Sequence, residues 1–134
     1  MYIKNINGFI FLLALSLMGS TCRPQSEVAT VLYDKTWLHA VEEDSADVTV
    51  YRPNTYSFPP SRGRTGFSLD ADGTFRMLRI APTDGLEEHQ GRWKMVKKDL
   101  MHVTIAGPEP EDFYLQIISA SPELLETKRV TSVK

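Results

Sequence analysis

The chain has 134 residues, with 15 basic and 17 acidic side chains and a formal net charge of −2. This length suits one domain with a single core, and the charge lacks the basic excess typical of a nucleic-acid-binding protein. The only cysteine is Cys22, so the chain after it can form no disulfide, no thiolate zinc site and no cysteine nucleophile. We expect a monomer that binds no nucleic acid.

The N-terminal segment indicates a secretory signal peptide. Lys4 precedes a ten-residue apolar run at residues 9–18, and the small residues 19–21 follow it. A charged start, a short apolar stretch and a small-residue cleavage site are the parts of such a signal. The apolar run has about half the length that a membrane-spanning helix needs. We therefore expect residues 1–21 to be removed from the mature protein.

Small residues followed at once by Cys22 resemble the lipobox of bacterial lipoproteins. The resemblance implies cleavage before Cys22 and a diacylglycerol on its thiol, with residues 22–30 as lipidated cysteine and tether. Two or more acyl chains hold a protein stably on a membrane, whereas one chain binds only marginally. The expected location is a bacterial cell envelope, on its periplasmic or surface side. The alternative is ordinary secretion, with Cys22 free or removed.

Residues 31–134 are predicted to fold as short strands separated by turn residues. After a helical turn at residues 32–36, eight strands are expected, at residues 37–41, 48–51, 65–69, 74–80, 90–96, 100–106, 113–119 and 124–130. Acidic, Asp-Gly, Lys-Lys-Asp or Gly-Pro turns are expected at residues 42–45, 70–73, 82–85, 97–99 and 107–110. The proline-rich residues 53–60 should stay extended, because proline fixes φ and donates no backbone hydrogen bond.

The fold class follows from the side-chain alternation along these strands. At residues 100–105, Met101, Val103 and Ile105 alternate with polar residues, which is the period of a half-buried strand. Strands at intervals of about ten residues favour an all-β antiparallel meander that closes into a small barrel or sandwich. We expect this single domain to span residues 31–134.

Three sequence features together resemble the small lipocalin-like domains of bacterial lipoproteins. Trp37 begins the first strand, an F-x-x-x-x-D-G-x-F hairpin occupies residues 67–75, and G-x-W occupies residues 91–93. An alternating strand at residues 100–105 follows them. The resemblance covers about residues 32 to 130 and implies a lipocalin-like barrel.

Large side chains that share one face are the candidate ligand contacts. They are Trp37, Phe67, Phe75, Met77 and Trp93. An eight-stranded barrel can hold one small ligand in its interior. Alternatively, these side chains fill the barrel completely, which the short strands of so small a domain favour.

A second candidate is the loop that contains Tyr56, Arg62 and Arg64. Arginine forks suit the carboxylate or phosphate group of an anion or a protein partner. Alternatively, the two arginines pair with acidic residues of the protein itself and pin the loop. The peptide bonds before Pro59 and Pro60 could be cis or trans.

The sequence offers little for catalysis or metal binding. His39, His89 and His102 show no metal-ligand spacing, and the two carboxylates in residues 70–72 do not continue as a calcium loop. Nucleophile-elbow and phosphate-loop motifs are missing. We therefore expect no enzyme activity, no metal and no cofactor.

These observations favour a lipid-anchored envelope binding module that captures a small apolar ligand or a protein partner. The alternative is a structural or inhibitory envelope protein with a filled barrel. That protein would contact its partners through the loop at residues 51–64.

Overall fold

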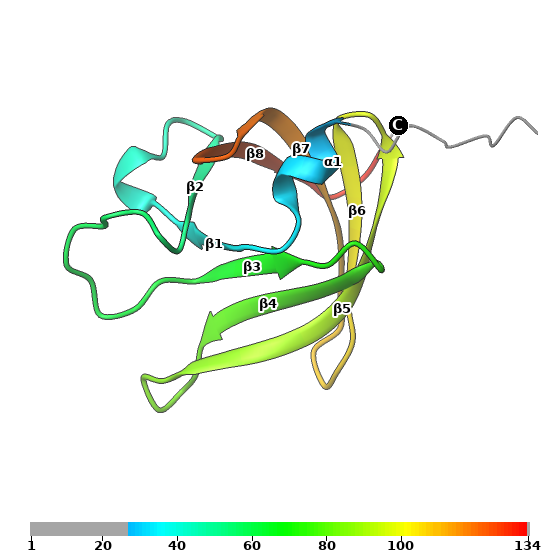
Figure 1. The fold of residues 1–134 in the computed structure, drawn as a ribbon. Helices are drawn as coiled ribbons and strands as arrows, with labels where there is room; N and C mark the ends of the chain where they lie inside the picture. The colour runs from blue at the N-terminus through cyan, green and yellow to red at the C-terminus, as the bar shows by residue number, and fades with distance from the viewer. Residues whose placement is uncertain (1–26, 134) are drawn as a thin grey trace, which may run out of the picture.

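Eight antiparallel strands close into one barrel in the computed structural model, which describes residues 27–133 (Figure 1). The strands are β1 Thr36–His39, β2 Thr49–Pro53, β3 Gly66–Leu69, β4 Thr74–Ile80, β5 Leu86–Lys97, β6 Leu100–Ile105, β7 Glu111–Ser121 and β8 Leu124–Val130. In the described part of the chain, helix α1 spans Glu27–Leu32 and a 3₁₀ helix, η1, spans Val41–Glu43. The predicted all-β antiparallel fold is confirmed, and it closes as a barrel. The expected meander holds only from β3 to β8, because β2 pairs with β8 and β1 pairs with β3.

Strand β1 closes the barrel because it pairs on both edges. The order around the barrel is β1-β2-β8-β7-β6-β5-β4-β3, with β3 returning to β1. Trp37 of β1 lies opposite Pro53 of β2 on one side and opposite Phe67 of β3 on the other. Thr49 of β2 lies opposite Thr127 of β8. Strands β3 to β8 therefore form a simple meander, and β1 and β2 complete the ring.

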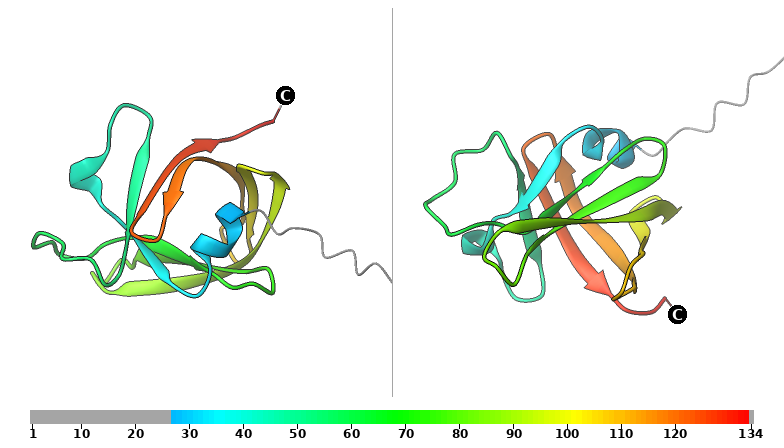
Figure 2. Two further views of the ribbon diagram at one scale, coloured as in Figure 1. Left: turned by 45° about the horizontal axis from the view of Figure 1, so that its top comes forward. Right: turned by 90° about the horizontal axis from the view of Figure 1, so that it is seen from below.

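Helix α1 covers one end of the barrel, which we call the closed end (Figure 2). Ala29 and Leu32 are buried there, three residues apart and so on one face of the helix. The indole Nε1 of Trp37 donates a hydrogen bond of 3.2 Å to the carbonyl of Leu32. The ring of Tyr33 lies 5.5 Å from that of Trp93. We call the opposite end, where β3, β5 and β7 begin, the open end.

The core lies inside the ring, on the faces that the alternation predicted. Its buried side chains are Leu32, Trp37, Phe67, Leu69, Phe75, Met101, Val103, Ile105, Phe113, Leu115, Ile117 and Leu125. Successive residues of a strand point to opposite faces, so every second residue of β6 and β7 enters the core.

The first strand is shorter than the predicted residues 37–41. Val41, expected as the last residue of that strand, begins η1 and is 58% exposed. Asp44 explains the difference. Its carboxylate accepts a hydrogen bond of 2.9 Å from the backbone N–H of Val50 and lies 2.7 Å from Nε2 of His39. These contacts turn the chain back towards β2 just after β1.

The helix also lies earlier than predicted. The sequence indicated a helical turn at residues 32–36, whereas α1 occupies Glu27–Leu32 and overlaps the expected tether at residues 22–30. The reason is tertiary, because Ala29 and Leu32 gain burial against the barrel end. An isolated six-residue helix would be too short to be stable in water.

Three strands extend beyond their predicted limits. Strand β2 continues past the predicted residues 48–51 to Pro53, which pairs with Trp37, so the proline-rich stretch begins inside a strand. Strand β5 begins at Leu86, which pairs with Ile80 of β4, and so it starts before the predicted residues 90–96. Strand β7 likewise extends at both ends of the predicted residues 113–119. In β5 and β7, polar residues continue the hydrogen-bonded ladder beyond the limit that the sequence predicted. The peptide bonds before Pro59 and Pro60 are trans.

The predicted signal at residues 1–21 and the predicted lipidation at Cys22 lie outside the described residues. Within residues 27–133, no helix has the length and apolar character needed to cross a membrane.

Candidate functional site

The inner faces of the strands become more polar from the closed end to the open end. On β8, Leu125 is fully buried, Thr127 is 1% exposed, and the side chain of Arg129 is 54% exposed at the open end. On β1, the buried Trp37 is followed on the same face by His39. Side chains two residues apart on a strand share one face, so this gradient follows the barrel axis.

Strand β4, across the ring from β8, and strand β7, the neighbour of β8, repeat the gradient. On β4, Phe75 is buried, Met77 lies next along the same face, and Arg79 follows at the open end. On β7, which approaches from the opposite direction, Phe113 is buried and Glu111 precedes it at the open end. The open end therefore has charged groups directly above an apolar interior.

A partly enclosed cavity of about 250 Å³ occupies the interior below these charges. Its apolar and aromatic walls come from Tyr51, Phe67, Phe75, Met77, Phe113 and Leu115. Its polar groups come from His39, Thr49, Thr127 and Arg129. A groove of about 310 Å³ shares Tyr51, Phe67, Met77 and Arg129 with the cavity and continues to Arg79 and Glu111. The cavity and the groove together form a passage from the surface into the barrel.

Aromatic contacts build the walls of the cavity. The rings of Phe67 and Phe75 stack at a centroid distance of 5.3 Å, and Tyr51 meets Phe67 edge-on at 4.9 Å. Phe113 meets Phe75 edge-on at 6.5 Å. Such pairs fix ring orientation beyond simple area burial. The cavity therefore has rigid walls on its β2, β3, β4 and β7 sides.

Three residues with a hydroxyl group, Thr49, Tyr51 and Thr127, line this cavity. The Oγ1 of Thr127 is buried and has no hydrogen-bond partner among residues 27–133. Leaving a buried hydroxyl without a partner costs free energy, about 1–3 kcal/mol. Burial raises the pKa of Tyr51 to about 12, with the Asp44 carboxylate adding to the effect. The Tyr51 phenol therefore keeps its proton at neutral pH.

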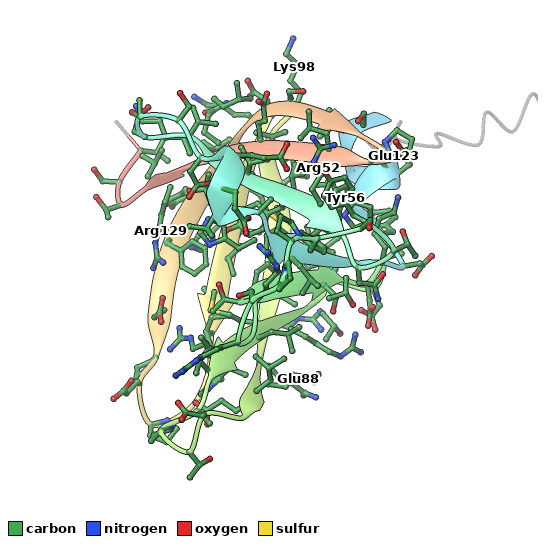
Figure 3. All side chains as sticks on the ribbon, turned by 90° about the vertical axis from the view of Figure 1, so that its left-hand side faces the viewer. Arg52, Tyr56, Glu88, Lys98, Glu123 and Arg129 are labelled. Carbon is green, nitrogen blue, oxygen red and sulfur yellow. The ribbon has the colours of Figure 1, made fainter. Side chains whose placement is uncertain are left out.

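Two guanidinium groups share one carboxylate at the open end. Nη2 of Arg129 donates to Oε2 of Glu111 at 2.8 Å, and Nη2 of Arg79 pairs with Oε1 of the same residue. Arg129 also lies over the ring of Phe113, with Cζ 4.0 Å from its centroid (Figure 3). Nε of Arg79 donates to the sulfur of Met77 at 3.2 Å. We call this cluster of Arg79, Glu111 and Arg129 the arginine pair. Its two guanidinium groups and one carboxylate give it a net positive charge.

Three of the five predicted ligand contacts line this cavity. They are Phe67, Phe75 and Met77. Trp37 lies at the closed end, fully buried and bonded to the α1 backbone. Trp93 also lies towards that end, where its Nε1 donates to the carbonyl of Asp70 at 2.9 Å. The structure therefore separates the two tryptophans from the other three residues.

Sequence reasoning missed the cavity residues on β2 and β8. Tyr51 was named only as part of the loop approach, and Thr127 and Arg129 were not singled out. The alternation Leu125, Thr127, Arg129 on one face of a predicted strand is the signal that could have found the last two. It places a hydroxyl and then a charge beyond a buried leucine.

Arg64 is held by acceptors of the protein itself. Its side chain is 8% exposed, and its guanidinium donates to both carboxylate oxygens of Glu42 at 2.9 and 2.6 Å. It also donates to the carbonyls of His39 at 3.0 Å and Pro59 at 2.9 Å. The hydrogen bonds that the Glu42 carboxylate accepts, above all those from Arg64, lower the pKa of Glu42 to about 2. The geometry supports a pinning role for Arg64.

The other two predicted loop residues are exposed. Arg62 lies at the surface of the loop, and Tyr56 is partly covered by Arg52, whose Cζ is 4.8 Å from its ring centroid (Figure 3). Arg52 itself binds the carboxylate of Glu43. The predicted set of Tyr56, Arg62 and Arg64 therefore does not converge on one site.

A surface cleft larger than the cavity in the barrel lies elsewhere. It measures about 470 Å³ and is lined by residues such as Lys35, Asn54 and Glu123, between the start of β1 and the β7–β8 turn. It is wide open to solvent and has few apolar walls. The enclosed cavity inside the barrel is the better candidate, because ligand sites are concave and mostly apolar.

Each histidine pairs with its own acidic neighbour. His39 pairs with Asp44, His89 with Glu87 and His102 with Asp112. Within residues 27–133, no group of three potential ligands is placed to hold a metal ion. Comparison of the chain with known protein families, with curated proteins and with solved structures finds no match.

Proposed function

We propose that this protein is a lipid-anchored binding module of a bacterial cell envelope, of lipocalin-like type. Its barrel takes up one small ligand with an apolar body through the open end. The observation that carries the proposal is the partly enclosed cavity of about 250 Å³, walled by aromatic and aliphatic side chains. An eight-stranded barrel is wide enough to hold one small ligand.

The cavity favours binding over a wholly filled barrel. Its volume is just below the range of about 300–1,000 Å³ typical of small-molecule sites, which indicates a small ligand. Each square ångström of apolar surface that a ligand buries there contributes about 25 cal/mol. The filled part of the interior, around Trp37 and Leu125, lies at the closed end and leaves this space open.

The polar groups of the cavity suit recognition better than catalysis. Thr127 Oγ1 has no hydrogen-bonded base to activate it. The Tyr51 phenol, with its pKa raised to about 12, is a neutral hydrogen-bonding group at physiological pH. We therefore propose a protein that binds its ligand unchanged and is not an enzyme.

The proposed anchor is compatible with an accessible open end. Cys22 precedes Glu27, the first residue of α1, by five positions in the chain. Five residues reach at most about 17 Å when fully extended. A lipid on Cys22 would therefore hold the α1 end of the barrel near the membrane and leave the open end facing away from it.

The alternative role for the loop at residues 51–64 has less support. Arg64 and Arg52 are both paired with carboxylates of the protein itself, Glu42 and Glu43. Exposed Arg62 and Tyr56 remain available to a partner, but they do not form a concave surface with the paired arginines.

A neutral fluorescent probe tests the proposed function. Mature protein with Cys22→Ser should enhance the fluorescence of N-phenyl-1-naphthylamine in a saturable titration. Leu115→Trp, which fills the cavity, should weaken binding at least tenfold. Ile118→Trp is the matched control, because Ile118 lies on the outer face of the same strand, and it should bind as the parent does. A flat titration of the parent would sink the proposal.

A further inference from the structure

We propose that the ligand is an amphiphile with a carboxylate head, and that its head binds the guanidinium groups of Arg79 and Arg129 while its apolar body fills the cavity. The inference rests on the proposed function and names the class of ligand for the same site. It begins from the arginine pair, in which two cations share the single carboxylate of Glu111.

The arginine pair has donors to spare. A guanidinium carries five N–H donors, and Glu111 engages one terminal nitrogen from each arginine. The two positive charges exceed the one negative charge, so a second carboxylate at this point would make the cluster neutral. A planar fork that binds a carboxylate through two parallel hydrogen bonds is the geometry that arginine provides. The cluster therefore has the donors and the charge to bind one more carboxylate besides that of Glu111.

The position of the pair matches an amphiphilic ligand. Arg129 lies on the face of Phe113, and Arg79 lies against the sulfur of Met77. Phe113 and Met77 are themselves walls of the apolar cavity. A ligand with its head on the guanidinium groups would therefore enter apolar surroundings within its first few bonds.

The arginines come from opposite walls of the passage. Arg79 is on β4 and Arg129 is on β8, and three strands, β5, β6 and β7, separate them on that side of the ring. Both reach Glu111 on β7, so the carboxylate sits between them at the open end. A ligand head that replaces or joins Glu111 there is aligned with the passage below it.

Thr127 provides a second and independent indication of a ligand. Its side chain lies two residues from Arg129 on the same face of β8, deeper in the cavity. Its buried Oγ1 has no hydrogen-bond partner in the part of the chain that the structure describes. An oxygen of a bound ligand would satisfy this hydroxyl, which can both donate and accept. Because Thr127 lies deeper than the arginines, this hydroxyl indicates a ligand in the cavity and does not by itself indicate the carboxylate head.

Octanoate and 1-octanol form the decisive pair of probes, because they share a chain length and differ in the charged head. Isothermal titration calorimetry of the mature Cys22→Ser protein should give at least tenfold tighter binding of octanoate. Arg129→Met and Arg79→Met keep side-chain bulk and remove the charge. Each should weaken octanoate binding about tenfold and leave octanol binding unchanged.

Arg76→Met is the matched control. Arg76 is on β4 like Arg79, but it pairs with Asp70 and Glu88 on the outer face of the barrel. This variant should bind octanoate as the parent does. Glu111→Gln should act in the opposite direction and tighten octanoate binding, because it removes the anion that competes for the arginines. If an arginine variant fails to fold, the Glu111→Gln variant still tests the carboxylate assignment.

The outcomes separate this inference from the function on which it rests. Equal affinities for octanoate and octanol, with no effect of Arg79→Met, Arg129→Met or Glu111→Gln, would overturn the carboxylate assignment and leave a neutral-ligand site. If octanoate, octanol and the neutral fluorescent probe all fail to bind, both the carboxylate assignment and the proposed binding function are overturned.

Discussion

At the scale of single residues, the two arginines that flank Gly63 have different environments. Arg62 is exposed, whereas Arg64 bridges the proline-rich loop to η1 through Glu42 and the carbonyls of His39 and Pro59. Its Cζ also lies 4.5 Å from the ring centroid of Phe58. One buried guanidinium with four acceptor contacts explains how a loop without secondary structure keeps one conformation.

The Arg64–Glu42 pair predicts an acid-dependent contribution to stability. Its hydrogen bonds lower the folded-state pKa of Glu42 from its ordinary 4.5 to about 2. The stabilisation is therefore fully present above about pH 5 and is lost as the pH falls through 2. Glu42→Gln should lower the melting temperature by several degrees at pH 7, and the difference from the parent should shrink towards pH 2.

Thermal unfolding followed by tryptophan fluorescence across this pH range measures the effect. Glu109→Gln is the control, because Glu109 is an exposed carboxylate in the β6–β7 turn. It should give a small difference at every pH. A Glu42→Gln difference that stays constant down to pH 2 would contradict the ion-pair assignment.

At the scale of elements, closure of the barrel brings strand backbones very close at two glycines. A Cβ on Gly66 would lie 2.1 Å from the carbonyl oxygen of Trp37 in β1, and a Cβ on Gly91 would lie 2.1 Å from that of Thr104 in β6. Neither contact is possible for a real side chain. These positions need glycine for space, because the neighbouring backbone cannot move without breaking a ladder.

The glycines give a test of this closure. Gly66→Ala should destabilise the protein by about 1–3 kcal/mol or more, because β1 and β3 must separate to admit the methyl group. Gly85→Ala is the matched control, since its Cβ would meet nothing within 4 Å in the β4–β5 turn. Its effect should stay within about 0.5 kcal/mol. Urea unfolding measures both, and equal effects would contradict the close approach.

At the scale of the whole molecule, the barrel has two different ends. Helix α1 fills one with Ala29 and Leu32, and the arginine pair borders the passage at the other. The chain enters α1 at the closed end, so an N-terminal lipid would attach on the side away from the passage. This polarity is what an anchored protein needs to receive a ligand from the aqueous compartment.

Expression of the full chain in a bacterium tests the proposed anchor. The parent should sediment with membranes and enter the detergent phase on extraction, because acyl chains contribute about 0.8 kcal/mol for each buried methylene. Cys22→Ser should move most of the protein to the soluble fraction. An unchanged distribution would remove the lipoprotein interpretation and leave ordinary secretion.

The fold was largely predictable from sequence because its signals are local. Alternation along residues 100–105 and 124–130 has the period of a strand, and Asp-Gly at residues 72–73 provides a turn, so element type and order follow from neighbours in the chain. Boundaries were less accurate where pairing extended a strand, as at Leu86, or where a side chain bent it, as at Asp44.

By itself, the sequence determined an all-β chain with a large side chain on the inner face of nearly every strand. Only the tertiary structure decided which of those side chains fill the core and which surround a cavity. Trp37 and Phe67 lie directly opposite each other in the ladder between β1 and β3, yet only Phe67 lines the cavity. The arginine pair required closure too, because Arg79 meets Glu111 from a strand that is not its neighbour in the sheet.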